Sequence, residues 1–245
     1  MRFRLATPVL LVLIVAAVAT LLGLGVWQVQ RAGWKANLIA TRNAQLAGQP
    51  LSAAEAHPLS GEALDYRLVA LQGTWDADHV MILANRARFS VKGENIVQPF
   101  VLTSGEAVLV ERGWYATGER EAALANLRST SVGATSGLAR YVEGARANRT
   151  GAGTWTALAP ESMAAELPYK VLPWYVIEGG LLAADGGSRP ASPPAQGFLP
   201  YTSTTPHIEY ALTWFGIAAA LIVIAVVHFV VEPRRAARRG FTKSE

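Results

Sequence analysis

The sequence predicts a membrane protein in which an N-terminal and a C-terminal transmembrane α-helix flank an extracytoplasmic, antiparallel β-rich α+β domain. Each end of the 245-residue chain carries an apolar run long enough to cross a bilayer, which needs about 20 residues. The basic residues behind the net charge of +4 gather outside these two runs and leave a nearly neutral body. The middle of the chain has short apolar stretches broken by turn residues, a pattern typical of strands.

The N-terminal transmembrane helix is expected within residues 1–30. This segment opens with MRFR and is then apolar from Val9 to Trp27. Ala17-Val18-Ala19 resembles a signal-peptide cleavage site, but the apolar run continues beyond it and is too long for a usual signal core. The pattern therefore favours an uncleaved anchor, and Arg2 and Arg4 predict a cytoplasmic N-terminus.

Residues 31–50 are expected to continue this helix outside the membrane. Trp27, Arg31, Trp34 and Leu38 recur at helical spacing, which predicts one aromatic and basic face. Gly48-Gln49-Pro50 should end the helix. The face is either an anchor at the membrane surface, to which Lys35 also contributes, or one wall of a binding site.

Residues 51–187 are expected to form the β-rich domain. Ser52 to Glu55 has the spacing of a capping box, which predicts a short helix. Ser104-Gly105-Glu106 predicts a hairpin turn. Two further helices are expected at Glu119–Leu127 and Pro160–Leu167. The expected strands are Tyr66–Leu71, His79–Ala84, Asn95–Leu102, Ala107–Arg112, Leu138–Val142 and Val171–Ile177.

Residues 188–206 are rich in Pro, Ser and Thr and lack apolar periodicity, which predicts an extended linker. The C-terminal transmembrane helix follows at 207–232, with no charged residue between Ala211 and Val231. Thr205 is a candidate N-cap, with Pro206 in the first turn. The basic tail 233–245 predicts a cytoplasmic C-terminus.

Small residues four apart in both expected membrane helices would let helix backbones approach closely. These are Ala19 with Gly23, and Gly216 with Ala220. The two membrane helices are therefore candidates to pair with each other or with a partner.

One face of the second membrane helix combines an imidazole with two aromatic rings. His207, Tyr210 and Trp214 lie at i, i+3 and i+7, at the outer membrane surface. They either belong to an interfacial aromatic belt with a histidine beside it, or hold a flat apolar ligand, in which case Trp27, Arg31 and Trp34 would line the opposite side.

Several functional classes lack support in this sequence. Without cysteine, the chain has no disulfide, iron–sulfur or thiolate chemistry, and hydrolase and nucleotide-binding motifs are missing. Basic ends on a neutral body argue against nucleic acid as a partner. His57 and His79 are expected to be solvated, and His228 to reach the membrane surface. The chain is therefore not expected to be an enzyme.

Two motifs in this order, each beside a membrane span, resemble the Surfeit locus protein one family of cytochrome c oxidase assembly factors. The first is Gly25-x-Trp27-Gln28-x-x-Arg31-x-x-Trp34-Lys35, and the second is His207-x-x-Tyr210-Ala211-Leu212-Thr213-Trp214-Phe215-Gly216. Inner landmarks of the family also have counterparts, among them Arg112-Gly113-Trp114. The chain departs from the family's usual residues at Thr205, at Glu111 and around Arg146 to Trp155.

The resemblance implies an assembly factor for the haem–copper oxidase that assists haem a delivery or insertion into subunit I. His207 would be the haem iron ligand, and Tyr210, Trp214, Trp27, Arg31 and Trp34 would be further binding residues. Implied partners are subunit I, other assembly factors, the haem a synthesis machinery and the lipid bilayer. The implied location is the bacterial inner membrane, crossed twice. The alternative is a membrane-tethered scaffold or sensor that binds a protein partner without haem.

Overall fold

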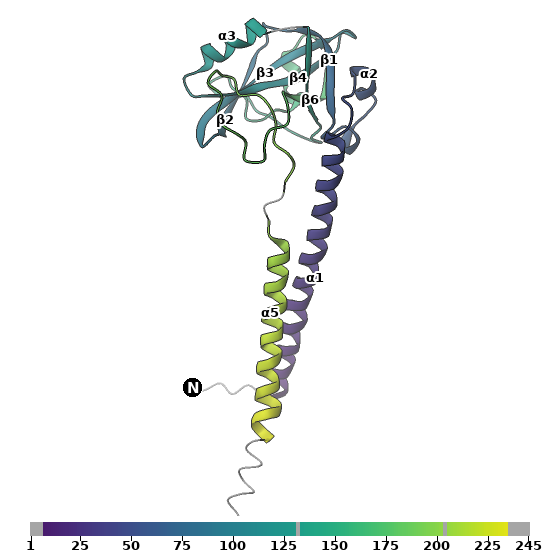
Figure 1. Ribbon diagram of the computed structural model, residues 1–245, viewed down its shortest axis with the longest axis vertical. Coiled ribbons are helices and arrows are strands. Elements are labelled where there is room, and N and C mark those ends of the chain that lie inside the picture. Colours follow the sequence, from purple (N-terminus) through teal and green to yellow (C-terminus); the bar gives the residue numbers. More distant parts are fainter. Residues whose placement is uncertain (1–6, 131–132, 203–204, 235–245) are drawn as a thin grey trace, which may run out of the picture. The chain divides into compact units, whose positions relative to one another are not determined.

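The computed structural model describes residues 7–130, 133–202 and 205–234 (Figure 1). The chain divides into two compact units. One unit combines Met1–Ile39 with Ser203–Glu245, and the other is Ala40–Thr202. The helices are α1 (Thr7–Leu46), α2 (Ala53–Ala56), η1 (Gly61–Ala63), α3 (Arg120–Thr130), α4 (Pro160–Met163), η2 (Ala164–Glu166), α5 (His207–Val226) and η3 (Val227–Val231).

The first unit contains two long apolar helices that lie side by side (Figure 1). α1 and the continuous helix His207–Arg234 are both long and apolar enough to cross a membrane. Most of their large apolar side chains are exposed within the chain, as lipid-facing residues would be. α1 runs without a break to Leu46, which confirms the prediction that the first apolar helix continues beyond Trp27 and ends near Gly48.

The second unit is built on one six-stranded sheet in the order β1-β5-β6-β4-β3-β2. β1 also pairs with β3, so the sheet closes into a barrel of five strands, and β2 extends it at β3. The strands are β1 (Leu68–Trp75), β2 (Met81–Arg88), β3 (Val91–Leu102), β4 (Ala107–Ala116), β5 (Ala134–Arg140) and β6 (Val171–Glu178).

The expectation of a purely antiparallel domain is wrong, because β4 and β6 pair in parallel. A parallel pair requires a long crossover, and the chain between these strands supplies one through α3, β5 and the segment that leads to α4. The other pairings are antiparallel, and the hairpin of β3 with β4 is confirmed. The domain is therefore a mixed α+β fold.

Local sequence signals for the short elements are confirmed. Ser52 Oγ accepts from the Glu55 amide, and the Glu55 carboxylate accepts from the Ser52 amide at 2.8 Å, which forms the capping box of α2. The hairpin turn has Gly105 at φ +85°. The helix expected at Pro160–Leu167 is divided into α4 and η2.

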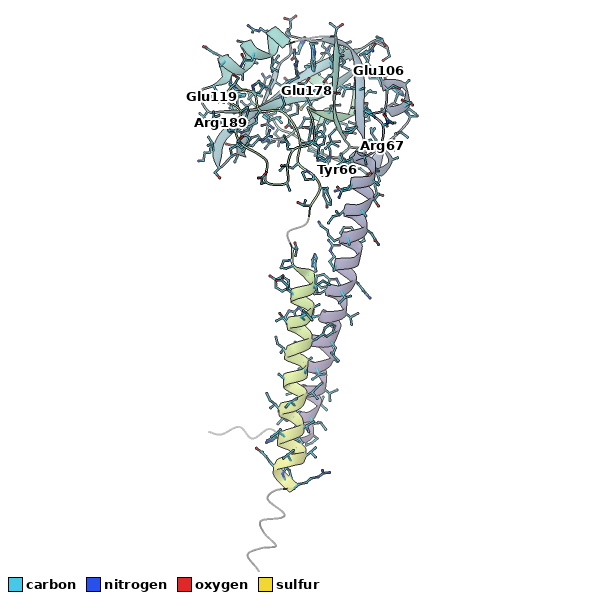
Figure 2. The ribbon with its side chains drawn as sticks, viewed as in Figure 1. Tyr66, Arg67, Glu106, Glu119, Glu178 and Arg189 are labelled. Atoms are coloured by element: carbon cyan, nitrogen blue, oxygen red, sulfur yellow. The ribbon has the colours of Figure 1, made fainter. Side chains whose placement is uncertain are left out.

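Residues 188–202 form no helix and no strand of the sheet, as their composition predicts, but they pack on the domain. Ala195 and Phe198 are buried, and Ala195 exchanges two backbone hydrogen bonds with Trp114 at 2.9 and 2.6 Å. Arg189 forms an ion pair with Glu119, and both side chains lie on the same side of the domain (Figure 2). These contacts make residues 189–198 part of the domain wall.

A buried ion pair ties two barrel strands together. Arg112 of β4 is 2% exposed, and its Nε donates to Glu178 Oε2 of β6 at 2.6 Å. Its Nη1 donates to Gln98 Oε1 at 2.7 Å, and the guanidinium lies 3.6 Å from the ring centroid of Trp75. Glu178 lies centrally in the domain (Figure 2). The buried charge is thus both paired and hydrogen-bonded.

Candidate functional site: the helix pair around His207

His207 is the first residue of α5. Pro206 occupies the N-cap position and no side chain caps the helix start, so the expected N-cap at Thr205 is wrong. The reason is geometric, since the helix starts one residue after proline rather than at it. The uncapped amide groups give the start of α5 a positive potential, and Glu209 lies in the first turn, where a carboxylate is favourable.

The His207 imidazole forms a hydrogen bond with a polar side chain of the neighbouring helix. Its Nδ1 atom lies 2.9 Å from Gln28 Oε1 of α1, and the imidazole is partly buried. The amide oxygen of glutamine is an acceptor, so Nδ1 carries the donated proton. The tautomer this contact selects has its lone pair on Nε2, the arrangement in which a second side chain orients a metal-binding histidine.

A recess of about 230 Å³ surrounds this histidine. Its walls are mostly apolar, but Lys35 of α1 adds a cation and Glu209 of α5 adds a carboxylate. The residues that line the recess are Ala32, Lys35, Ala36 and Ile39 of α1 with Thr205, Pro206, His207, Ile208 and Glu209. The volume is below the range of about 300–1,000 Å³ that encloses a drug-sized ligand.

None of the five other residues proposed for binding lines this recess. Trp27, Trp34 and Tyr210 are each about half exposed, and Trp214 is partly buried. Arg31 stacks over the Trp34 ring at 4.0 Å, which confirms that these two residues share a face. At about 100° per residue, Gln28 falls on a different side of α1 from Trp27 and Trp34.

Close packing between α1 and α5 occurs at Gly25. A Cβ atom at this position would collide with the Phe215 ring, and Ala211 and Ala218 of α5 are buried. Among the described residues, no side chain of α5 lies within 4 Å of a Cβ placed at Gly23 and none of α1 within 4 Å of one placed at Gly216, so these two glycines do not take part in the packing of α1 on α5. Of these three glycines, only Gly25 leaves room for a side chain of the other helix, the Phe215 ring.

The helix pair therefore joins the two sequence motifs through residues that spacing alone did not select. Gly25 and Gln28 lie one turn apart on α1, while His207 and Phe215 face them from α5. Gln28 and Lys35 belong to the first motif, and their place in that motif is the sequence feature that could have identified them. The aromatic periodicity of Trp27 and Trp34 marks another face.

The other three histidines are each paired with a carboxylate. His57 Nε2 lies 3.0 Å from Glu106, His79 Nδ1 lies 2.7 Å from Asp76, and His228 Nδ1 lies 3.2 Å from Glu232. The His57 and His79 side chains are 51% and 39% exposed, which agrees with the expectation that these two are solvated, and the His228 side chain is 59% exposed. The described residues hold no group of three or more histidine and acidic side chains that suits a metal ion.

Glu106 also receives a hydrogen bond of 2.7 Å from Lys170. This bond and the contact with His57 lower the pKa of the Glu106 carboxyl. Glu106 lies at the edge of the domain (Figure 2). His57 is therefore held in a surface ion cluster, a setting that differs from the helix-start position of His207.

Comparison with known proteins assigns the chain to a family. The model of the SURF1 family matches residues 15–219. A "SURF1-like protein" of Rickettsia felis is 27% identical over 85% of this chain and 91% of its own length. The "Surfeit locus protein 1" of Xenopus tropicalis is 25% identical over 89% of this chain and 75% of its own.

A third relative is more similar over a shorter stretch. The "Cytochrome oxidase assembly protein SHY1" of Saccharomyces cerevisiae is 37% identical over 93 residues, which are 37% of this chain and 24% of the yeast protein. The family match covers both motifs of the helix pair and the whole barrel between them. The chain belongs to the SURF1 family.

Proposed function

We propose that this protein is an assembly factor for haem–copper cytochrome c oxidase that assists haem a delivery or insertion into subunit I. The observation that carries the proposal is the imidazole of His207, oriented by Gln28 within the two motifs that the family match includes. The name of the yeast relative, an assembly protein of cytochrome oxidase, supports the process. Subunit I and other assembly factors are the proposed partners, and the enzymes of haem a synthesis are proposed donors.

His207 is the residue of the helix pair that would hold a haem iron. The contact with Gln28 orients Nε2 as the available lone pair, and neutral imidazole is a common ligand of haem iron. These features support His207 as the ligand.

We propose that haem is bound only transiently, and the small volume of the recess supports this. It is too small to enclose a macrocycle, so most of a bound haem would stay outside the space that these residues line. Tyr210 and Trp214 are proposed to contact the exposed part because they lie one and two turns along α5 from His207. Trp27, Arg31 and Trp34 are proposed to act as a second contact face or as a membrane-surface anchor.

The proposed location is the bacterial inner membrane, with both termini in the cytoplasm and the barrel outside it. Two helices with the required length and apolarity support two spans. The basic residues near both chain ends support the orientation. The proposed role is not enzymatic, since assembly requires binding and transfer rather than a covalent step by this chain.

The test is to purify the full chain from cells that make haem a and to compare it with His207→Ala. The native protein is expected to carry haem a absorbance, and the variant should lose it while reaching the membrane at normal abundance. Oxidase that contains haem a should also fall. His79→Ala is the control and should leave the spectrum unchanged. An unaltered haem spectrum in His207→Ala would exclude this ligand and favour a scaffold that binds a protein partner.

A further inference from the structure

The barrel domain contains a larger cavity that no part of the proposed function uses. Its volume is about 460 Å³, within the range of about 300–1,000 Å³ typical of small-molecule sites. It is lined from β2, β3, β4, β5 and β6 and from the segment that precedes Thr202. The polar and aromatic side chains that line it are Tyr66, Arg86, Arg88, Asn95, Glu111, Trp114, Arg140, Phe198, Tyr201 and Thr202.

Two β-bulges direct these side chains into the cavity. The pairing of β2 with β3 shifts between Leu83 and Arg86, after which Arg86 and Arg88 lie two residues apart on one face. On β4, Glu111 and Gly113 pair with successive residues of β3 and leave Arg112 as the extra residue. Glu111 and Trp114 therefore both line the cavity, while Arg112 reaches into the core.

The wall opposite the strands is the chain segment that follows Pro194. Gly113 has φ +120°, and a Cβ at this position would lie 2.8 Å from the carbonyl oxygen of Ala195. Only glycine permits so close an approach at this backbone conformation. Phe198 is buried beside the cavity, so the wall is packed rather than loosely apposed.

Three guanidinium groups line the cavity against one carboxylate. Arg86 donates to the carbonyl of Thr156 at 3.1 Å, and Arg88 donates to the carbonyl of Ala195 at 2.8 Å. Backbone carbonyls satisfy these donors but do not neutralise the charge. Arg140 pairs through Nε with Asp65 at 2.8 Å, which leaves its two terminal nitrogens outside that bond.

Glu111 is the single carboxylate of the lining. Burial raises the pKa of Glu111, although Arg86 and the 2.6 Å hydrogen bond from Asn95 Nδ2 oppose the shift. Asn95 Oδ1 is buried without a hydrogen-bond partner among the described residues. The cavity is thus lined by more cationic than anionic side chains. It also contains a carboxyl group whose ionised form is disfavoured by burial, and one acceptor atom without a hydrogen bond among the described residues.

Aromatic rings make up much of the remaining wall. Tyr66 and Tyr201 meet edge to face at 5.4 Å, and the Arg42 guanidinium lies over both rings at 4.3 and 4.2 Å. Arg140 lies 4.5 Å from the Tyr66 ring as well. Rings fixed in this way offer rigid apolar surface close to the positive groups.

We propose that this cavity binds an amphipathic anion, a carboxylate or phosphate carried on a ring-shaped apolar body. The guanidinium groups suit such an anion because they bind carboxylate and phosphate oxygens through paired hydrogen bonds. The aromatic wall suits its apolar body. The cavity and the recess around His207 have no lining residue in common, and the existence of the cavity does not depend on whether the protein holds haem.

The test uses full-length protein in neutral detergent and three probes that share a naphthalene ring. 2-Naphthoate carries a carboxylate, 2-naphthyl phosphate carries a phosphate, and 2-naphthamide is neutral and reports partition into detergent. Titration calorimetry should show saturable binding of at least one anion and none of the amide. The anion that binds more tightly identifies the chemistry of the ligand. Equal binding of all three probes would overturn the proposal.

Matched variants locate the binding. Arg86→Gln keeps an N–H donor for Thr156 but loses the charge, and it should weaken anion binding about tenfold. Arg86→Lys should retain more of the affinity. Arg149→Gln is the control, because Arg149 is exposed and pairs with Glu166 outside the cavity.

In a second variant we expect stronger rather than weaker anion binding. Glu111→Gln retains an acceptor for Asn95 and removes the only negative charge of the lining, so anion binding should strengthen. This gain cannot result from misfolding. Unchanged affinity in both Arg86→Gln and Glu111→Gln would exclude the cavity as the site, whatever the His207 variant does.

Discussion

His207 Nδ1 and Gln28 Oε1 lie 2.9 Å apart, although 179 positions separate the two residues along the chain. The contact makes Gln28 a positioning residue for the imidazole. Replacement of a side chain that orients a metal-binding histidine in this way typically lowers metal affinity by about 10- to 100-fold.

The first prediction follows from this contact. Gln28→Leu keeps the size of the side chain but cannot accept the Nδ1 proton, so haem a co-purification should fall about tenfold at unchanged protein abundance. Gln28→Glu restores an acceptor and should recover most of the signal. Absorption spectra of both purified variants measure the effect. Normal haem content in Gln28→Leu would show that the contact does not orient a ligand.

The second prediction concerns the packing of α1 on α5. Gly25→Leu places a branched side chain where the Phe215 ring lies, so the helix pair should separate or shift and the protein should lose thermal stability in detergent. Gly23→Leu is the matched control, because its Cβ position is open. Phe215→Ala in the Gly25→Leu chain should restore part of the stability. Equal melting of the two leucine variants would contradict the prediction.

The third prediction addresses the buried ion pair of Arg112 and Glu178. Arg112→Met leaves a carboxylate of low exposure without its cation, and the free energy of unfolding should fall by about 3–5 kcal/mol. Chemical unfolding of the full chain, followed by tryptophan fluorescence, measures the change. The double variant Arg112→Met with Glu178→Gln should lose less, since no unpaired charge stays buried. A larger loss in the double variant would argue against this explanation.

The fourth prediction is a loss of stability at alkaline pH. Burial, followed by the hydrogen bond to Glu94, raises the pKa of Tyr115 to about 12. The phenol of an unfolded chain titrates near about 10. The native state therefore keeps the proton where the unfolded chain loses it, so this stabilisation is complete below pH of about 10 and disappears as the pH rises towards about 12.

Replacement of the hydroxyl isolates this contribution. Tyr115→Phe cannot titrate at this position, so its melting temperature should decline less steeply over the same alkaline range. Thermal melts at a series of pH values compare the variant with the native chain. Parallel pH profiles for the two proteins would show that Tyr115 does not contribute.

The fifth prediction tests membrane orientation. A reporter that is active only outside the cytoplasm should work when it is fused near Ser104 and fail after residue 243, because basic flanks stay in the cytoplasm. Mass spectrometry of the purified protein should find the N-terminal apolar segment intact. A mature protein that begins at Thr20 would replace the first membrane anchor by a cleaved signal.

Local sequence patterns predicted the elements whose formation depends on neighbours along the chain. Two apolar runs predicted the long helices, the spacing of Ser52 and Glu55 predicted α2, and Gly105 predicted the hairpin turn. These features form within one element or one turn, so a short stretch of sequence contains the residues that cause them. The start of α5 at His207 was predictable for the same reason.

Tertiary structure alone decided which faces meet. The periodicity of Trp27 and Trp34 marks a real helix face, yet Gln28 and Gly25 contact α5, because that choice depends on side chains nearly two hundred residues away. The cavity around Glu111 also has no local signal. It requires two bulges, a parallel pair of strands and the return of the chain past Gly113, and each depends on pairing between distant segments.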